Sequence, residues 1–303
     1  MCGPERREGE VAVAVPSRRR ESLLTQSAAG PRSERPWQLR LFDKTLKKKQ
    51  KLALLARLLG RPGVDDRLLL LTNGDNNGAM NYIVRQLGGR WTWGECEAAA
   101  IPEMQQFLGE PVVHCVPERL DFPDAAFDAV VVIDVHEHLV ETAPLNRELF
   151  RIVRPGGRVI VTTPNGDLGK LAVRIKNLVG MTKETYGHVR VGYTIEEHRR
   201  MLTDAGFLPG ASGSYSQFPT EMIELAINLA YVKLLSRKRQ AANPGEHGPI
   251  APASADQVRK VEKALRLHGA IYPFCRAVSS LDVLLAPFAT GYAVAVVGEK
   301  PAR

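Results

Sequence analysis

A short, continuous apolar run followed by a helical pattern constrains the fold of this 303-residue chain more than any other feature. Residues 129–133 (AVVVI) lack the polar alternation of a half-exposed strand, so they fit a strand covered on both faces. Residues 141–153 place leucine, isoleucine and valine at helical spacing, which predicts an amphipathic helix. Pro155, Gly156 and Gly157 end that helix, and the β-branched run 159–163 predicts a second strand. The unit is a strand–helix–strand crossover, which indicates an α/β fold with a doubly wound, mostly parallel sheet.

Polar residues follow both predicted strands. Asp134 and Glu137 come after the first strand, and Thr163 and Asn165 stand at the end of the second. In doubly wound sheets, ligands bind in a crevice beyond the carboxyl ends of the strands. We therefore expect the chemistry of this chain at that edge.

The motifs between Leu120 and Asn165 resemble those of class I S-adenosylmethionine-dependent methyltransferases of the type 11 group. In order, they are Phe-Asp before the valine strand, Glu-His after it, Arg-x-x-Arg-Pro-Gly-Gly at the turn, and Thr-Pro-Asn. The resemblance covers residues 67–215, and residues 291–298 are suited to the last strand. It implies a seven-stranded Rossmann-like sheet, S-adenosylmethionine as cofactor and a methyl transfer reaction.

The resemblance also implies a glycine-rich turn after the first strand, where a helix N-terminus receives the carboxylate end of the cofactor. Gly74 and Gly78 stand at two of the three expected glycine positions, and Asn76 replaces the middle one. Thr72 occupies a position that is usually acidic. The contact to the amino group of the cofactor is therefore absent or passes to Asp75.

An acidic residue after the second strand, residues 90–96, is implied to bind the ribose hydroxyls. Glu95 and Glu97 are the candidates, and the strand register favours Glu95. Glu97 also fits a solvated glutamate that is stabilised by the dipole at a helix start. Asp134 is the further residue expected around the cofactor.

Catalysis in this family would be displacement at an activated sulfonium methyl group, so alignment of the nucleophile matters most. A hydroxyl acceptor benefits from a base, and His188 and His138 are the histidines nearest to the expected crevice. His188 is the better candidate because its loop also contains Tyr186 and Arg190. His138 at a helix start is equally suited to packing or hydrogen bonding. We expect O-methylation of a small-molecule or lipid-like acceptor.

Two other functions stay open. A noncatalytic binding module is supported by Thr72, Asn76 and Val116, which depart from the cofactor pattern. A nicotinamide-dependent oxidoreductase would use a similar glycine turn and acidic residue, but it does not explain the later motifs.

Composition limits the setting and the partners. Four cysteines are scattered without a close pair, which argues against a metal site or a disulfide framework and fits a reducing cytoplasm. The formal net charge of +8 is compatible with nucleic acid or an acidic membrane. An aromatic content of 6% without basic-aromatic interleaving argues against nucleic acid. Sequence gives no oligomeric state.

The chain divides into four predicted parts: a disordered basic tail (1–36), the methyltransferase core (37–217), a helical cap or insertion (218–288), and the last strand with the C-terminus (289–303). The core is expected to begin with one continuous helical pattern from Trp37 to Leu59 that carries the lysine run 44–51. We interpret this run as a solvated helix face that covers the cofactor-site side of the sheet, with contact to an acidic membrane surface or an anionic substrate as the alternative. The insertion is expected to cover the substrate side. It could instead lie peripherally on the inner membrane surface or form a dimer interface.

Overall fold

The computed structural model describes residues 35–74, 77–239 and 262–302. Asp75 and Asn76, both predicted to bind the cofactor, lie outside the described residues. So do the predicted tail, apart from its last two residues, and the predicted linker around residues 243–254.

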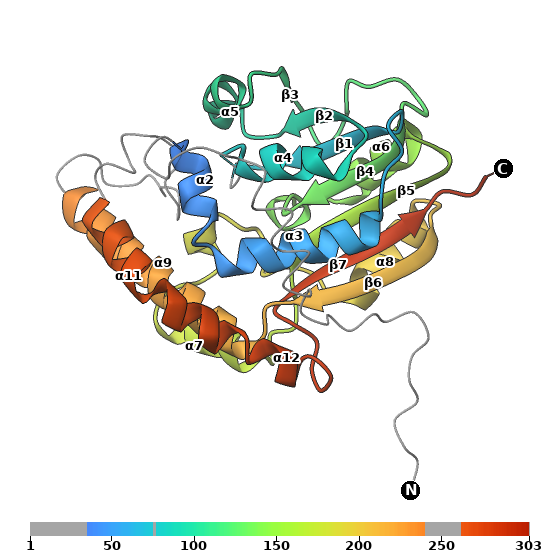
Figure 1. Cartoon of the computed structure of the whole chain (residues 1–303). Helices are drawn as coiled ribbons and strands as arrows, with labels where there is room; N and C mark the ends of the chain where they lie inside the picture. The colour runs from blue at the N-terminus through green and yellow to red at the C-terminus, as the bar shows by residue number, and fades with distance from the viewer. Residues whose placement is uncertain (1–34, 75–76, 240–261, 303) are drawn as a thin grey trace, which may run out of the picture.

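A seven-stranded sheet forms the centre of the protein, with the strand order β3-β2-β1-β4-β5-β7-β6. Strand β7 runs antiparallel to both of its neighbours, and the other adjacent pairs are parallel. The strands are β1 (Arg67–Thr72), β2 (Arg90–Glu95), β3 (Val112–His114), β4 (Phe127–Ile133), β5 (Val153–Pro164), β6 (Leu208–Tyr215) and β7 (Ala293–Glu299). This arrangement confirms the predicted doubly wound, mostly parallel Rossmann-like sheet with a helical insertion before the last strand (Figure 1).

The central strands are buried because both faces of the sheet are covered. Alternate residues of β1 and β4 enter two separate hydrophobic clusters, one on each face. Residues Ala129–Ile133 of β4 are all buried, as the valine run predicts. Strand β3 ends at His114, and Val116 forms only an isolated bridge with Arg119.

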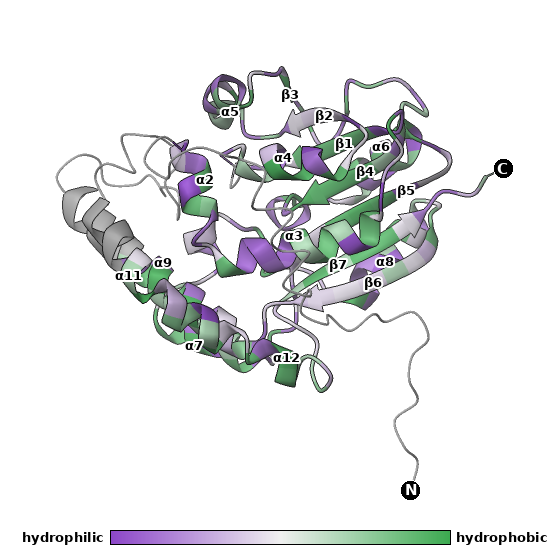
Figure 2. Cartoon of the chain, in the orientation of Figure 1, coloured by the Kyte–Doolittle hydropathy of each residue, from purple (hydrophilic) through white to green (hydrophobic). Residues whose placement is uncertain are grey.

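Helices flank the sheet on both faces. They are α2 (Trp37–Phe42), α3 (Leu46–Leu59), α4 (Ala79–Val84), α5 (Ile101–Leu108), α6 (Ala143–Ile152), α7 (Leu171–Leu178), α8 (Ile195–Asp204), α9 (Phe218–Arg239), α11 (Glu262–Ser279) and α12 (Asp282–Leu285). The described residues also form four 3₁₀ turns: η1 (Arg85–Leu87), η2 (Ala98–Ala100), η3 (His136–His138) and η4 (Glu184–Tyr186). Figure 2 shows hydrophobic residues along the central strands and hydrophilic ones at the beginning of α3. Among the described residues, no helix combines the length and apolar character that crossing a membrane requires.

The prediction of one continuous helical pattern between residues 37 and 59 is wrong. The chain leaves the helix after Phe42 and starts a second one at Leu46. Thr45 Oγ1 donates to the Phe42 carbonyl, and Lys49 Nζ donates to the Asp43 carbonyl. These side chains satisfy carbonyl groups that a helix end leaves unpaired, so the break is stabilised locally.

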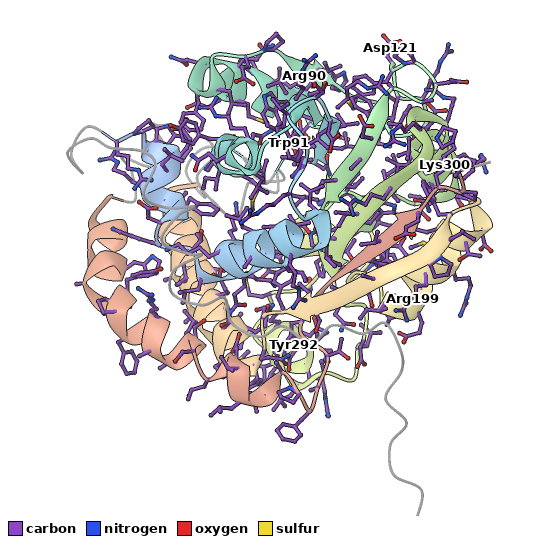
Figure 3. All side chains as sticks on the ribbon, turned by 45° about the vertical axis from the view of Figure 1, so that its right-hand side comes forward. Arg90, Trp91, Asp121, Arg199, Tyr292 and Lys300 are labelled. Carbon is purple, nitrogen blue, oxygen red and sulfur yellow. The ribbon has the colours of Figure 1, made fainter. Side chains whose placement is uncertain are left out.

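Helices α9, α11 and α12 lie between β6 and β7 in the sequence. Helix α9 packs against α3, α7, α11 and α12. The carboxyl ends of the parallel strands point toward the side of the molecule that carries α2, α9 and α11 (Figure 1). Tyr292, at the end of β6 and β7 that faces α7 (Figure 3), accepts a hydrogen bond from the Ala172 amide of α7 at 3.1 Å. The insertion and α7 therefore adjoin the edge where doubly wound sheets bind ligands.

Candidate functional site

The turn after β1 requires glycine at its two ends. Gly74 has a φ of 71° and Gly78 a φ of 85°, in the left-handed region that favours glycine. A Cβ atom at Gly78 would lie 2.9 Å from the ring of Phe107 on α5, whereas one at Gly74 would make an ordinary contact with Glu97. Gly78 then leads directly into α4. The two ends of the turn therefore both have left-handed backbone.

Glu95 ends β2 and is completely buried beneath this turn. Its carboxylate accepts hydrogen bonds from Thr72 Oγ1 at 2.6 Å, from the Gly74 amide at 2.7 Å and from the Glu97 amide at 2.8 Å. Burial raises the pKa of Glu95, although each of the three donors acts in the opposite direction. One carboxylate thus joins the end of β1, the glycine turn and the segment after β2.

Glu97 has a different environment. Its side chain is exposed and accepts a bond from the Ala99 amide at 3.4 Å, which caps η2. Glu97 also lies beside the turn, since its Cβ would be 3.4 Å from a Cβ at Gly74. Both predicted candidates for the ribose contact therefore border the turn, one buried and one solvated.

Asp134 follows β4 with a left-handed φ of 52°. Its carboxylate accepts a hydrogen bond from Thr162 Oγ1 at 3.2 Å and forms an ion pair with Lys51 of α3. Burial opposes ionisation of Asp134, but the charges of Lys51, Lys47 and His188 outweigh it and lower the pKa of this carboxyl. Asp134 is therefore held ionised at the carboxyl end of the sheet.

A pocket of about 390 Å³, part of it open to solvent, lies where these elements meet. It is lined by Lys48, Lys51, Thr72, Asn73, Met80, Ile133 and Asp134. Two of the predicted cofactor residues, Thr72 and Asp134, thus share one pocket. Sequence reasoning missed Asn73, Met80 and the two lysines.

The interpretation of the lysine run as a solvated face is wrong. None of residues 47–51 is exposed, and Lys51 is buried. The signal was present in the sequence, because Lys51 precedes the buried Leu55 and Leu58 by one and two helical turns and therefore shares their face. The run points inward toward the pocket and the insertion.

A second buried charge lies behind this lysine run. Glu221 of α9 is fully buried between Lys47, at 2.5 Å, and Lys176 of α7. Ser216 Oγ donates a further hydrogen bond to it at 2.6 Å. Burial disfavours the charged form, yet the two ammonium groups together lower the pKa of Glu221 to about 2. Three separate elements are thereby joined through one carboxylate.

The two histidines proposed as bases lie next to each other. Their ring centroids are 4.7 Å apart with the planes at 83°, and His138 Nδ1 lies 3.1 Å from the Gly187 carbonyl oxygen. The loop that carries His188 is held against η3 because the Val189 and Arg190 amides donate to the Glu137 carbonyl. The fold therefore brings together residues fifty positions apart.

His136 belongs to a different environment. Its ring is fully buried, with Nε2 2.8 Å from Asn146 Oδ1 on α6. Burial lowers the pKa of His136 to about 4, so the ring is neutral at physiological pH. Of the His-x-His pair, only His138 belongs to the candidate site.

Comparison with known proteins identifies the segment that contains the turn, the second strand and the β4–α6–β5 unit. Residues 74–161 match a family described as a methyltransferase domain. This part of the chain is therefore similar to a methyltransferase domain. In addition, 47 residues of the chain are 50% identical to a protein of Mycolicibacterium smegmatis described as a probable S-adenosylmethionine-dependent methyltransferase. That match spans 16% of this chain and 18% of that protein.

Solved structures share the fold of the methyltransferase domain at low sequence identity. A structure from Bacillus halodurans, titled as a methyltransferase, covers 82% of this chain and 98% of its own, with a TM-score of 0.50 and 15% identity. The [4+2]-cyclase SpnF covers 84% of this chain and 80% of its own, with a TM-score of 0.50 and 18% identity. Because these identities are low, the likenesses support the class I methyltransferase fold and do not decide the reaction.

Proposed function

We propose that the chain is an S-adenosylmethionine-dependent methyltransferase that methylates an oxygen atom of a small-molecule or lipid-like acceptor. The observation that carries the proposal is the convergence of the Gly74–Gly78 turn, Glu95 and Asp134 at one edge of the sheet, within the segment that matches the methyltransferase domain. Such an arrangement provides a backbone cradle and two carboxylates for a cofactor that carries both positive and negative groups.

The residues present fit this cofactor. Gly74 and Gly78 have the left-handed backbone of a tight turn, and Lys48 and Lys51 supply positive charge for a carboxylate group. Glu95 already accepts three hydrogen bonds, but a carboxylate has about four acceptor positions, so it retains capacity for a ribose hydroxyl. Asp75 and Asn76, in the undescribed part of the turn, complete the proposed cofactor set with Thr72 and Asp134.

The cofactor supplies an activated sulfonium methyl group, and the remaining task of the protein is to position an acceptor and receive its proton. We assign that task to His188, with His138 beside it. His188 is close enough to Asp134 to affect its ionisation, which puts the histidine on the same side of the sheet as the pocket. A hydroxyl acceptor therefore agrees with the local groups.

The helical insertion, residues 218–288, is the proposed cap over this acceptor. Its later part carries apolar side chains in solvent: Phe274 is 72% exposed, Leu284 66% and Phe288 85%. Large apolar side chains grouped on a surface are typical of a membrane or partner contact. We propose that this surface allows peripheral contact with a membrane, which agrees with a lipid-like acceptor. We expect the protein to bind anionic vesicles, and we expect the double variant Phe274→Ser with Phe288→Ser to lose this binding. Unchanged binding by the double variant would contradict the proposal.

Calorimetric titration with S-adenosylmethionine and S-adenosylhomocysteine, with NAD as control, tests the cofactor assignment. Transfer of labelled methyl groups to a panel of hydroxyl and amine acceptors then tests the reaction. Binding followed by transfer to hydroxyls supports the proposal. Binding of both sulfur compounds without transfer would favour the noncatalytic module, whereas binding of NAD alone would favour the oxidoreductase.

A further inference from the structure

Three side chains with metal-ligating atoms converge beside the pocket. Glu137 and His138 belong to η3, and His188 comes from the loop that packs against it. One ligand atom from each lies within 4.8 Å of the other two. Two imidazoles and a carboxylate are a donor set that binds divalent transition-metal ions, and in zinc sites of this kind a fourth position stays open.

From this geometry we infer that Glu137, His138 and His188 form a binding site for one divalent transition-metal ion. The scattered cysteines of the sequence argued against a metal site, and His136 with His138 supplies only two neighbouring imidazoles. In the structure the His136 ring is directed to Asn146, and His188 from a distant loop lies beside His138 instead. No local spacing could have shown this third ligand.

The orientation of His138 supports the assignment. Its Nδ1 faces the Gly187 carbonyl at 3.1 Å, so that nitrogen carries the proton and Nε2 presents a lone pair. Nε2 is buried and has no hydrogen-bond partner among the residues that the structure describes. Histidines that bind metals are commonly held in this way, with one nitrogen donating to a carbonyl and the other facing the ion.

The backbone around the site is also held in place. The amides of Val189 and Arg190 donate to the Glu137 carbonyl at 2.9 and 3.3 Å, and the His188 amide donates to the Lys183 carbonyl at 2.9 Å. Ligands about 2.0 Å from a tetrahedral ion lie about 3.3 Å from each other, so side-chain rotations alone can close the cluster from its present spacing. Glu137 is fully buried, and the two histidines are half-buried, which leaves a path for the ion.

Two of the described cysteines, Cys96 and Cys115, are poor competitors for the ion. Burial raises the pKa of Cys115 to about 12 and raises that of Cys96 further. Metal binding requires the thiolate, so these two thiols are protonated and inert at neutral pH. Binding through nitrogen and oxygen ligands is therefore distinguishable by spectroscopy from binding through sulfur.

An ion at this site would have a chemical consequence that rests on the proposed function. Its open position could take the hydroxyl oxygen of an acceptor and lower the pKa of that hydroxyl. Ligated imidazoles have no lone pair to receive a proton, so the metal role and the base role of His138 and His188 exclude each other. Metal binding itself can be measured without methyl transfer.

The experiment uses the full chain without an affinity tag, titrated with Zn²⁺ by calorimetry and with Co²⁺ by absorption spectroscopy. We expect one ion per chain, Co²⁺ bands without thiolate charge transfer, and a higher melting temperature with Zn²⁺. His188→Ala and His138→Ala should each weaken binding at least tenfold, while His114→Ala, which removes an exposed histidine on β3, should leave it unchanged. Circular dichroism verifies that each variant is folded.

Failure to bind either ion, or binding that His188→Ala and His138→Ala leave unchanged, would overturn the metal site. A thiolate charge-transfer band would overturn it as well, because the ion would then be held by cysteine. These results would leave the cofactor titration unaffected, so failure of the metal site and failure of the proposed function remain distinguishable.

Discussion

Lys51 and Asp134 form an ion pair that joins α3 to the end of β4 inside the pocket. The exposed fractions of the two side chains are only 9% and 19%, so solvent screens the pair weakly. Helix α3 thus contributes directly to a site that sequence reasoning assigned to the glycine turn and the strand ends.

Removal of one partner of this pair should cost more than removal of both. We expect Lys51→Met to lower the free energy of unfolding by about 3 kcal/mol, because it leaves Asp134 charged and largely buried. Adding Asp134→Asn should recover part of the loss, with a coupling energy on the order of 1–3 kcal/mol in urea denaturation. The same cycle with Lys48→Met, at another lysine that lines the pocket, should give a smaller coupling. Equal couplings would show that the pair has no special role.

Substitution of Glu95 should separate the two candidates for the ribose contact. We expect Glu95→Gln to weaken S-adenosylmethionine binding about 10- to 100-fold, the range for a lost hydrogen bond to a charged group. Glu97→Gln, at the exposed glutamate beside the same turn, should change affinity less than about threefold. Calorimetry measures both, and a large loss in the Glu97 variant alone would assign the contact to Glu97.

Stability should fall in acid through Glu221. Its pKa of about 2 lies below the ordinary glutamate value of 4.5, so its contribution is complete above 4.5 and is lost as pH falls toward 2. The shift corresponds to an energy on the order of 3 kcal/mol. Glu221→Gln should therefore be strongly destabilising at pH 7 and progressively less so at lower pH, as measured by denaturation at several pH values.

Glu224 is a matched control on the same helix. Burial raises the pKa of Glu224, so folding disfavours its ionised form, the opposite of the effect at Glu221. Glu224→Gln should be neutral or stabilising at pH 7, and that effect should disappear in acid. A parallel response of the two variants would contradict the assigned charge centre around Glu221.

The glycine turn should tolerate a side chain less well than another left-handed glycine nearby. Gly109 ends α5 with a φ of 68° and open space around it, so Gly109→Ala should cost about 1–2 kcal/mol of backbone strain. Gly78→Ala must also displace the Phe107 ring, which adds about 1–3 kcal/mol. Thermal unfolding should show this order, and only the Gly78 variant should bind the cofactor less tightly. Equal stability and affinity would place the turn outside the site.

Sequence predicted the centre of the fold well because its signals are local. The run Ala129–Ile133 can be buried only in a strand covered on both faces, and the Gly74–Gly78 turn needs left-handed backbone wherever it lies. The helix break near Asp43 was missed because the apolar pattern continues across it, and the stabilising bonds come from side chains of Thr45 and Lys49.

The inward lysines and the histidine cluster depend on contacts between distant segments. Lysine is usually exposed, and only the burial of Glu221 and Asp134 opposite the run makes an inward face favourable. His138 and His188 meet because a loop binds to the Glu137 carbonyl, a contact that no periodicity encodes. Sequence could name the histidines, but it could not predict that they are neighbours.

The position of α3 in the chain has a consequence for how the protein is made. Gln50 of α3 bonds to Asp282, 232 residues later, and Lys47 pairs with Glu221. During synthesis from the N-terminus, these partners emerge long after α3. Loop closure over such separations is slow, so the mouth of the pocket should be among the last regions to become ordered. A ribosome-bound chain that stops before α9 could form much of the sheet, but it would lack the acidic partners that hold the first lysines in place.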